Sequence, residues 1–559
     1  DQIKAADING DGNITIQDAL KVLQHNVELI TLEPSLSFYD ANTGNALSTI
    51  TFNPGDTPSI TVIRQGDANL SFEPSSIIIE VKFKKDGDTF TFNTKNATRY
   101  DFALPERIMP VDFNNDGIDD LLMMPTGFWQ GEDIPIRAFI FENDQYIEKT
   151  SSLFTETIVT GVNFHGLVHD FNGDGWNDVI IPDSGKEGGN DSNIPSSEID
   201  YQYFKKIYIL SNGDGTYSLA NEKIEHNIAM FNHNAGIGDI NGDNHPDLFF
   251  AILHGNEGSS ETLDLLFTQA AVYFNDGVGN FSVPDPLGSL IPFRTEEYYF
   301  MPGGGSIIDL DNDGLGELLM HGGGSKNNDL KHPQSHAEDQ YIKIFSYDTS
   351  NGFIPFASIP INENIKNSCG AFLGTRIIPI DLNNDNLKDF AAGWEWIGEE
   401  TCDHDVYWQF MLNKGGGIFE DVSNTTTIRP NFLDSTDRAV YFHANDINGD
   451  GFEDILNASN GGKVEVFEDD LILSRFDSET FIPVKILVDE NKLLSEYIAD
   501  SEIGSSGSLP NQMEYWPVWL NLNKDEKLDL MIFKYMDWEK GQTPEDIGVD
   551  YYALRFIAE

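Results

Sequence analysis

The sequence predicts an all-β fold in which one supersecondary unit is repeated seven times along the chain. An acidic loop of the form D-x-[ND]-x-D-x-x-x-[DE] occurs seven times, and a short apolar segment follows each copy at once. The first residues of successive copies are 58, 69, 70, 72, 65 and 75 positions apart. Such a period is typical of arrays whose units bury their faces against one another.

The seven copies share this pattern and differ mainly at their sixth and seventh positions. They are DFNNDGIDDLLM (112–123), DFNGDGWNDVII (170–181), DINGDNHPDLFF (239–250), DLDNDGLGELLM (309–320), DLNNDNLKDFAA (381–392), DINGDGFEDILN (446–457) and a degenerate copy, NLNKDEKLDLMI (521–532). We call them loops 1 to 7 and number the nine positions of each loop from its first residue.

Further strands are predicted around each loop. A short apolar or Gly-rich stretch precedes the loops, and an alternating segment later in most units runs into a Gly/Asn/Asp turn. Examples are IYILSNGDGTY (207–217), VYFNDGVGNF (272–281) and FMLNKGGGIF (410–419). Alternation that ends in such turns indicates β-hairpins. Four short strands in each of seven units predict a seven-bladed β-propeller.

The composition of the loops predicts Ca²⁺ sites. Side-chain oxygens stand at positions 1, 3, 5 and 9, and position 7 offers a backbone carbonyl. Ca²⁺ accepts about six to eight such hard oxygen ligands. The predicted ligands are Asp112, Asn114, Asp116, Ile118 and Asp120; Asp170, Asn172, Asp174, Trp176 and Asp178; Asp239, Asn241, Asp243, His245 and Asp247; Asp309, Asp311, Asp313, Leu315 and Glu317; Asp381, Asn383, Asp385, Leu387 and Asp389; and Asp446, Asn448, Asp450, Phe452 and Asp454.

Loop 7 differs from the others and is expected to bind weakly or not at all. It has Asn521 at position 1, Glu526 where Gly is usual, and Lys527 at position 7. Loops 3 and 5 also lack the glycine, with Asn244 and Asn386 in its place. Asn tolerates the left-handed backbone conformation, so these two loops are retained as metal sites.

The N-terminal residues predict a different module, over residues 1–31. The stretch ADINGDGNITIQDALKVLQH (6–25) places acids and amides at Ca²⁺-loop spacing, followed by an amphipathic helix. Its predicted ligands are Asp7, Asn9, Asp11, Asn13 and Asp18. It resembles one half of a type I dockerin repeat, an EF-hand-like unit, although such repeats carry two loops and this chain shows one. A Ca²⁺-stabilised cap or linker is the alternative.

The repeats resemble the FG-GAP and VCBS repeats of secreted bacterial proteins, which are relatives of the integrin α-chain propeller. The resemblance covers roughly residues 77–559, and residues 32–76 are left as a small β segment or linker. It implies that each repeat is one four-stranded blade, with the acidic loop joining the innermost strand A to strand B. Most members of this group are binding or adhesion modules.

The two ends of the predicted propeller imply how the ring closes. Residues 77–92, IIIEVKFKKDGDTFTF, have the pattern of an outer hairpin, and YYALRFIAE (551–559) has that of a third strand without a partner. An open edge strand favours aggregation. We therefore expect the segment near residues 89–92 to supply the outer strand of the seventh blade.

The charge and the cysteines indicate where the protein acts. The net charge is −58, which argues against nucleic acid and anionic lipid as partners, because both require basic patches. No apolar run is long enough to span a membrane.

The two cysteines, Cys369 and Cys402, are both predicted to lie in the fifth unit on the face of the loops that join strand B to the third strand, C. A disulfide between them is therefore geometrically plausible and would fit an extracellular location. Two free thiols are the alternative. No signal peptide is visible in the sequence, as expected if the chain that begins at Asp1 is already processed or trimmed.

The predicted ligand site is formed by the B–C loops, which join strand B to the third strand of each unit on the face opposite the acidic loops. They are long and uneven, and they contain Trp129, Trp394, Trp396 and Trp538. Exposed aromatic side chains on such loops could stack on sugars; the alternative is that these rings fill the wide end of the propeller. His321 lies in one of these loops with His332 and His336, a spacing that could bind a transition metal but is also typical of solvated histidines.

A second candidate ligand position lies near the axis of the ring. Five residues before the first position of each loop stand mostly polar side chains, which could meet a ligand there or be solvated. They are Arg107, His165, Asn234, Gly304, Arg376, Tyr441 and Trp516.

These observations predict a secreted Ca²⁺-binding propeller that binds carbohydrate or a partner protein and serves in adhesion or surface assembly. The alternative is a polysaccharide-acting lyase or hydrolase. No serine-hydrolase elbow, zinc-protease motif or phosphate-binding loop is present. The sequence therefore favours a protein that is not an enzyme, and no catalytic residue is assigned.

Overall fold

The computed structural model divides the chain into two compact units, Asp1–Ile77 and Ile78–Glu559. It describes residues 36–40, 46–47, 60–64, 79–93, 108–124, 134–160, 166–182, 206–225, 227, 231–254, 272–283, 299–325, 339–363, 372–396, 406–423, 442–457, 472–476, 481–489, 492–500, 514–525, 527–535 and 550–559. The predicted N-terminal Ca²⁺ loop and the cysteine pair lie outside these residues.

In the first unit, the described residues form one three-stranded antiparallel sheet. Its order is β2–β1–β3, with β1 at Leu36–Asp40, β2 at Ala46–Leu47 and β3 at Ile60–Arg64. The small β segment predicted for residues 32–76 therefore contains strands.

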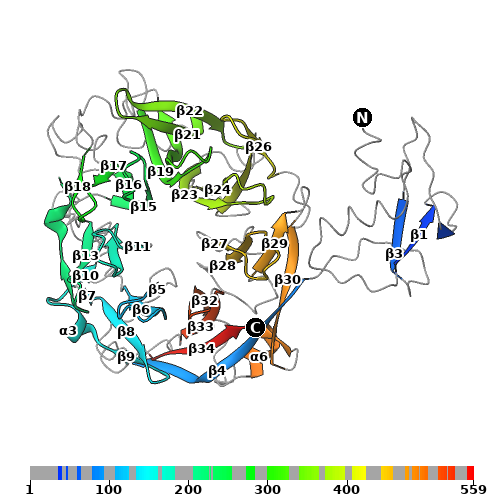
Figure 1. Cartoon of the computed structure of the whole chain (residues 1–559), viewed down its shortest axis with the longest axis horizontal. Helices are drawn as coiled ribbons and strands as arrows, with labels where there is room; N and C mark the ends of the chain where they lie inside the picture. The colour runs from blue at the N-terminus through cyan, green and yellow to red at the C-terminus, as the bar shows by residue number, and fades with distance from the viewer. Residues whose placement is uncertain are drawn as a thin grey trace, which may run out of the picture. The chain divides into compact units, whose positions relative to one another are not determined.

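The second unit is a β-propeller, in which sheets stand around a common centre (Figure 1). Five of its sheets are four-stranded and antiparallel, and in each the strand order follows the sequence order. The first contains β5 (Ile108–Val111), β6 (Asp120–Met123), β8 (Arg137–Glu142) and β9 (Gln145–Glu148). The second contains β11 (Leu167–His169), β12 (Asp178–Ile181), β13 (Ile207–Ser211) and β14 (Tyr217–Leu219).

The next three sheets repeat this arrangement. The third contains β15 (Phe231–Gly238), β16 (Asp247–His254), β17 (Val272–Asn275) and β18 (Phe281–Ser282). The fourth contains β19 (Tyr299–Ile308), β20 (Glu317–Ser325), β21 (Asp339–Asp348) and β22 (Gly352–Pro360). The fifth contains β23 (Phe372–Ile380), β24 (Asp389–Trp396), β25 (Val406–Asn413) and β26 (Phe419–Asp421).

The last two repeats share one nine-stranded sheet. Its path runs β27 (Phe442–Asn445), β28 (Asp454–Asn457), β29 (Ile472–Phe476), β30 (Phe481–Val488), β4 (Ile79–Asn93), β34 (Asp550–Ala558), β33 (Asp529–Tyr535) and β32 (Glu514–Leu520), and β31 (Lys492–Leu493) pairs with β30. The described strands therefore form six blade sheets, and the prediction of seven separate blades is corrected. The two repeats merge because β4 pairs in parallel with β30, the outer strand of the sixth repeat.

The strand β4 also confirms the expected pairing of the segment near residues 89–92 with the C-terminal strand at residues 551–559. It pairs antiparallel with β34, placing Phe92 opposite Tyr551 and Thr91 opposite Tyr552. The predicted hairpin at residues 77–92 is wrong, since β4 is one continuous strand of 15 residues. Gly87, with φ +66°, lies in β4 beside the register shift opposite Ala553 and Arg555, so the strand passes the expected turn with only a local irregularity.

Apolar side chains fill the spaces between neighbouring sheets. Between the first two sheets, Phe113 meets Tyr217 edge to face with ring centroids 5.2 Å apart. At the closure, Phe92 of β4 packs 5.2 Å from Phe139 and 5.6 Å from Phe533. These buried aromatic contacts connect each sheet to the next.

Few helices accompany the strands. The described helical segments are α3 (Thr150–Leu153), the 3₁₀ turn η2 (Asn221–Lys223) and α6 (Leu494–Asp500). The described residues include no helix with the length and apolar character needed to cross a membrane.

Candidate metal sites in the A–B loops

Each acidic loop joins the innermost strand of its repeat to the second strand, and loop 1 shows how its side chains hold it. Asp112 Oδ1 accepts the amide of Asp116 at 3.0 Å, and Asp112 Oδ2 accepts that of Gly117 at 2.8 Å. Asn114 Oδ1 also accepts the Asp116 amide, and Asp116 Oδ1 accepts the Ile118 amide, both at 2.9 Å. Side chains at positions 1, 3 and 5 therefore fold the loop around themselves through Asx turns.

The same frame recurs around the ring. Position 1 accepts the position 6 amide in all six loops that begin with Asp, at 2.8–3.0 Å. Position 6 takes a positive φ, which is +82° at Gly117 and +65° at both Asn244 and Asn386. The expectation that asparagine can replace glycine in loops 3 and 5 is confirmed.

Position 9 is buried in every loop. Its carboxylate accepts the position 2 amide of its own loop at 2.8–3.0 Å. In five repeats the other oxygen accepts an amide near the end of the third strand, as Asp120 Oδ1 does from Phe141 at 2.8 Å. Position 9 therefore links the loop to the third strand, in addition to its predicted role as a ligand.

Burial changes the proton affinity of these acids. It raises the pKa of Asp120, Asp178, Asp247, Glu317 and Asp389 to about 7, and two backbone hydrogen bonds oppose the rise at each of the four aspartates. Neighbouring loop carboxylates raise it further. The site thus concentrates negative charge that a bound cation would neutralise.

Loop 4 offers the most complete set of cation ligands in the described part of the chain. Carboxylate oxygens of Asp309, Asp311 and Glu317 lie within 4.8 Å of one another. Asp309 Oδ1 is buried without a hydrogen-bond partner, and burial followed by the charge of Asp313 raises the pKa of Asp311. An unsatisfied buried carboxylate oxygen among other hard oxygens fits a divalent cation such as Ca²⁺.

Neighbouring loops are bonded to one another through positions 8 and 1. Asp119, at position 8 of loop 1, donates its amide to the Asn521 carbonyl at 2.8 Å and accepts the Asn521 amide on Oδ2 at 2.6 Å. Glu453 of loop 6 accepts the Asp381 amide at 2.7 Å, and Gly316 of loop 4 donates to the Asp239 carbonyl at 2.6 Å. The acidic loops therefore touch around the ring, including the junction of loop 7 with loop 1.

The sequence pattern did not reveal these links between loops. The only signal was an acid at position 8, present at Asp119 and Glu453 but replaced elsewhere, for example by Lys388 in loop 5. Lys388 instead forms an ion pair with Glu453 of the next loop, with a distance of 2.7 Å between Nζ and Oε1.

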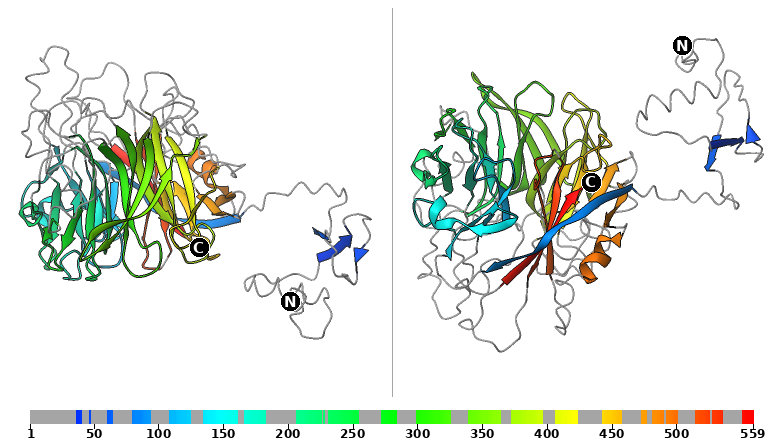
Figure 2. Two further views of the ribbon diagram at one scale, coloured as in Figure 1. Left: turned by 90° about the horizontal axis from the view of Figure 1, so that it is seen from above. Right: turned by 60° about the horizontal axis from the view of Figure 1, so that its bottom comes forward.

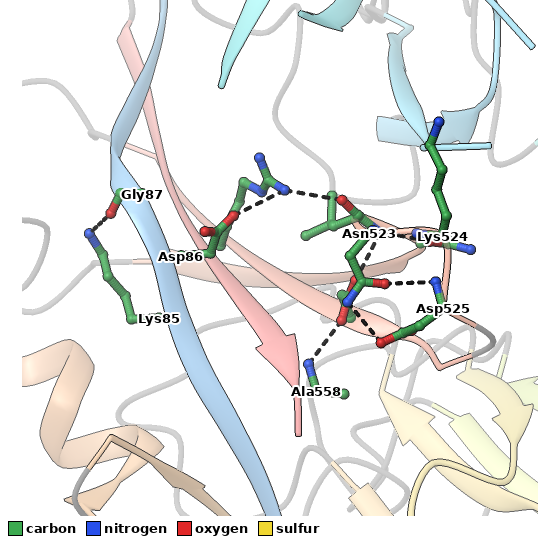
Figure 3. Close-up of polar contacts among 11 residues, drawn as sticks. Lys85, Asp86, Gly87, Asn523, Lys524, Asp525 and Ala558 are labelled. Carbon is green, nitrogen blue, oxygen red and sulfur yellow. Dashed lines mark hydrogen bonds and ion pairs between the residues drawn. The ribbon is translucent and has the colours of Figure 1, made fainter. Parts of the chain in front are cut away.

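Loop 7 keeps the hydrogen-bond frame with different side chains (Figure 3). Asn521 Oδ1 accepts the Lys524 amide at 2.9 Å, and Asn523 Nδ2 donates to Asp525 Oδ2 at 2.8 Å. Asp529 Oδ1 accepts the Ala558 amide at 2.9 Å. Burial raises the pKa of Asp529 to about 6, although the nearby Arg555 lowers it.

The predicted aromatic ligand site is corrected at Trp394. The structure places Trp394 within β24, fully buried, with its ring edge to face against His321 and its Nε1 donating to Gln409 at 3.1 Å. This position supports the alternative that the ring fills the interior. The backbone of Trp396 ends the same strand, while Trp129, Trp538 and His165 lie outside the described residues.

His321 is likewise buried rather than on a polar loop. It lies in β20, and its Nε2 is 2.6 Å from the Gly393 carbonyl. Burial lowers the pKa of His321 to about 4, so the ring is neutral at physiological pH. The proposed histidine partners, His332 and His336, are outside the described residues.

Among the candidate axis residues, two lie near one another in the structure. Asn234 is buried in β15 and donates from Nδ2 to the Thr375 carbonyl of β23 at 3.0 Å. Arg376 is buried beside it in β23. Asn234 therefore bridges the central strands β15 and β23 of two different repeats. This bridge leaves less space for a ligand near the axis of the ring at Asn234.

A buried lysine was not anticipated. Lys206 precedes β13 and is fully buried, and its Nζ lies 4.9 Å from the Phe250 ring centroid and 5.5 Å from that of Tyr273, without a hydrogen-bond partner. Burial lowers its pKa to about 7. Its sequence neighbourhood is polar, so nothing in the pattern signals the burial.

Comparison with known protein families supports the repeat. Residues 170–250 match the FG-GAP-like repeat family; this segment runs from loop 2 to the strand after loop 3. No curated protein matches the sequence significantly.

Similar solved structures share little sequence with this chain. Rhamnogalacturonan lyase YesW has 11% identity and a TM-score of 0.28, covering 81% of this chain and 68% of its own. A β-fructofuranosidase from Schwanniomyces occidentalis has 10% identity and a TM-score of 0.26, covering 81% and 63%. The exo-β-1,3-galactanase 1,3Gal43A from Clostridium thermocellum has 9% identity and a TM-score of 0.26, covering 87% and 97%. The structure itself and the family match together establish an all-β propeller that contains FG-GAP-like repeat sequence.

Proposed function

We propose that this protein is a Ca²⁺-stabilised propeller that works outside the cell as a binding, adhesion or surface-assembly module. The observation that carries the proposal is the group of Asp309, Asp311 and Glu317 in loop 4, with the buried Asp309 Oδ1 lacking a partner. Loops 1, 2, 3, 5 and 6 present the same residue types on the same backbone frame. Ca²⁺ bound to the folded state alone would stabilise the ring by mass action.

In this proposal, each of the seven repeats acts as one blade. The presence of two acidic loops, 6 and 7, in the nine-stranded sheet supports treating that sheet as two blades joined through β4. The paired contacts between Asp119 and Asn521 place the seventh repeat beside the first. This adjacency is what closure of a seven-membered ring requires.

The proposed ligand site is the face formed by the B–C loops. The A–B loops are held by hydrogen bonds and nearly constant in length, so variation that could serve recognition is concentrated at the other ends of the strands. Trp129, Trp396 and Trp538, with His165 near the axis, are the proposed contacts; Trp394 is not, because it is buried. A carbohydrate or a protein surface would suit exposed aromatic rings.

A glycan array probed with the full chain, in Ca²⁺ and in EDTA, tests this function. We expect Ca²⁺-dependent capture that falls about fivefold or more when Trp129 and Trp538 are both changed to Ala, since each stacking ring adds roughly 0.5–1.5 kcal/mol. Trp176→Ala is the matched control, because Trp176 stands in an A–B loop. Equal loss in the control would contradict the assignment of the binding face.

The same experiment separates binding from catalysis. A reducing-end assay on each captured glycan would show no new chain ends if the protein is a binding module. Accumulation of new ends would instead establish the alternative, an enzyme that cleaves polysaccharide.

A further inference from the structure

The loops differ in charge much more than in backbone structure. Residues 112–120 of loop 1 contain four acids and no base, a net charge of −4, whereas residues 521–529 of loop 7 contain three acids and two lysines, a net charge of −1. We propose that the seventh repeat and β4 form a Ca²⁺-independent closure of the ring, in which the chain's own cations take over the role of the metal charge. The inference rests on the proposed Ca²⁺ role of the other loops.

The first support is that loop 7 keeps its shape without an acid at position 1. The Asn521 side chain accepts the amides of Asn523 and Lys524 at 3.2 and 2.9 Å. Asp525 Oδ1 accepts the Lys527 amide at 3.0 Å, the same bond that position 5 makes in the other loops. Amide oxygen therefore replaces carboxylate oxygen as the acceptor, and the repulsion between carboxylates is reduced.

The second support is the buried cation Arg555. Its side chain is only 3% exposed, and it pairs with Asp86 of β4 at 3.2 Å while donating to the Leu522 carbonyl at 3.3 Å. Its guanidinium also lies 3.9 Å from the Phe141 ring centroid in the first sheet. Arg555 thus contacts β4, loop 7 and the first repeat at once, with Nη2 making both polar contacts and the guanidinium lying against the Phe141 ring.

In three other repeats, neutral groups donate to the same carbonyl. The position 2 carbonyl accepts Tyr217 Oη in loop 1 at 3.1 Å, Asn275 Nδ2 in loop 2 at 3.0 Å, and Asn413 Nδ2 in loop 4 at 2.6 Å. Among these four described contacts, only that of loop 7 comes from a cation. A positive charge is therefore present at the loop that has an amide, Asn521, in place of the first acid.

The third support is the connection to loop 1. Asp119 makes two hydrogen bonds with the backbone of Asn521, one from its amide and one to its carboxylate. These two bonds fix the first residue of loop 7, where the other loops place a metal-ligand acid. The seventh repeat is consequently held by protein contacts on both sides, from β4 and from repeat 1 (Figure 2).

Hydrogen exchange measured by mass spectrometry on the full chain, with Ca²⁺ and after chelation, tests the closure. In EDTA we expect the amides of β12, β16 and β20 to exchange at least about tenfold faster, while those of β33, β34 and β4 change by less than about threefold. Equal acceleration in β33 and β12 would overturn the closure alone. No acceleration anywhere would overturn the Ca²⁺ role and, with it, the distinction between the repeats.

Two variants keep the test decisive. Arg555→Met should remove the protection of β33 and β34 in EDTA, whereas Lys85→Met, which removes a β4 lysine that donates to the nearby Gly87 carbonyl, should not. If Arg555→Met does not fold, the combined change Asn521→Asp, Lys524→Gly and Glu526→Gly should fold in Ca²⁺ and make β33 sensitive to chelation. Persistent protection of β33 in that variant would contradict the proposal.

Discussion

Loops 4 and 7 share a hydrogen-bonded backbone and differ in how their charge is balanced. Loop 4 brings three carboxylates within 4.8 Å and leaves Asp309 Oδ1 buried without a partner. Loop 7 begins with Asn521, contains two lysines and contacts Arg555 through the Leu522 carbonyl. In both loops position 5 accepts the position 7 amide, at 2.8 Å in loop 4 and 3.0 Å in loop 7.

The difference between loops 4 and 7 separates two properties of the motif, the path of the loop backbone and the balance of its charge. Side-chain to backbone hydrogen bonds determine the path of the loop, since that path is kept when the first acid is replaced by an amide. In our proposal, a cation is needed where several carboxylates are crowded together and the bases within the loop do not offset most of their charge. The dependence of each repeat on Ca²⁺ should therefore follow its local charge rather than its loop conformation.

Removing the closing strand should have the largest effect. Deletion of residues 1–76 should leave a folded propeller, because the second compact unit begins at residue 78. Deletion of residues 1–95 also removes β4, which leaves the edges of β30 and β34 unpaired, and should give an aggregating or molten product. Circular dichroism and light scattering of the two truncations check this. Identical melting of both would show that closure does not depend on β4.

Chelation should have the next largest effect, and it should be uneven around the ring. EDTA should lower the Tm of the full chain by about 10 °C or more, because several bound ions stabilise the folded state together. Ca²⁺ should restore the Tm and Mg²⁺ should restore it much less, since Mg²⁺ requires a smaller octahedral site. An unchanged Tm after prolonged dialysis against EDTA would contradict the account.

A pair of substitutions sharpens the comparison within the motif. Asp450 of loop 6 and Asp525 of loop 7 both occupy position 5, and each accepts the position 7 amide at 3.0 Å. In Ca²⁺, Asp450→Ala should destabilise the protein by at least about 1 kcal/mol more than Asp525→Ala, because only the first removes a metal ligand. Denaturant unfolding in EDTA provides the control. A difference of the same size there would show that the metal is not its cause.

The smallest effect is expected at Lys206, a buried cation whose Nζ has no hydrogen-bond partner, whereas Arg555 pairs with Asp86. Burial lowers the pKa of Lys206 from 10.5 to about 7, so its destabilising effect is complete below pH 7 and disappears as the pH rises towards 10.5. Lys206→Met should therefore raise the Tm by about 3 °C at pH 6 and by much less at pH 10. An equal gain at both pH values would assign the effect to packing instead of charge.

The sequence predicts the parts of the fold that depend on local chemistry. The left-handed backbone at Asn244 and Asn386 follows from what asparagine tolerates, and the unpaired third strand at residues 551–559 correctly indicated that β4 closes the ring. Each of these inferences needs only the residues of one segment and a general rule about edges or turns.

The parts that could not be predicted depend on contacts between repeats. The parallel pairing of β30 with β4, which merges two repeats into one sheet, brings together segments about 400 positions apart. Asp119 and Asn521 are likewise 402 positions apart, and the burial of Trp394 depends on a contact with His321 of the preceding repeat. A tryptophan in a polar-looking segment has no local feature that distinguishes a loop from a buried strand.

Counting bound ions tests the central claim most directly. Native mass spectrometry of the Asp11→Ala variant, which disables the predicted N-terminal loop, should detect six Ca²⁺ ions per chain, one for each of loops 1 to 6. Adding Asn521→Asp, Lys524→Gly and Glu526→Gly should raise the count to seven. Seven ions before that change, or none in either variant, would contradict the claim that loop charge determines which repeats require the metal.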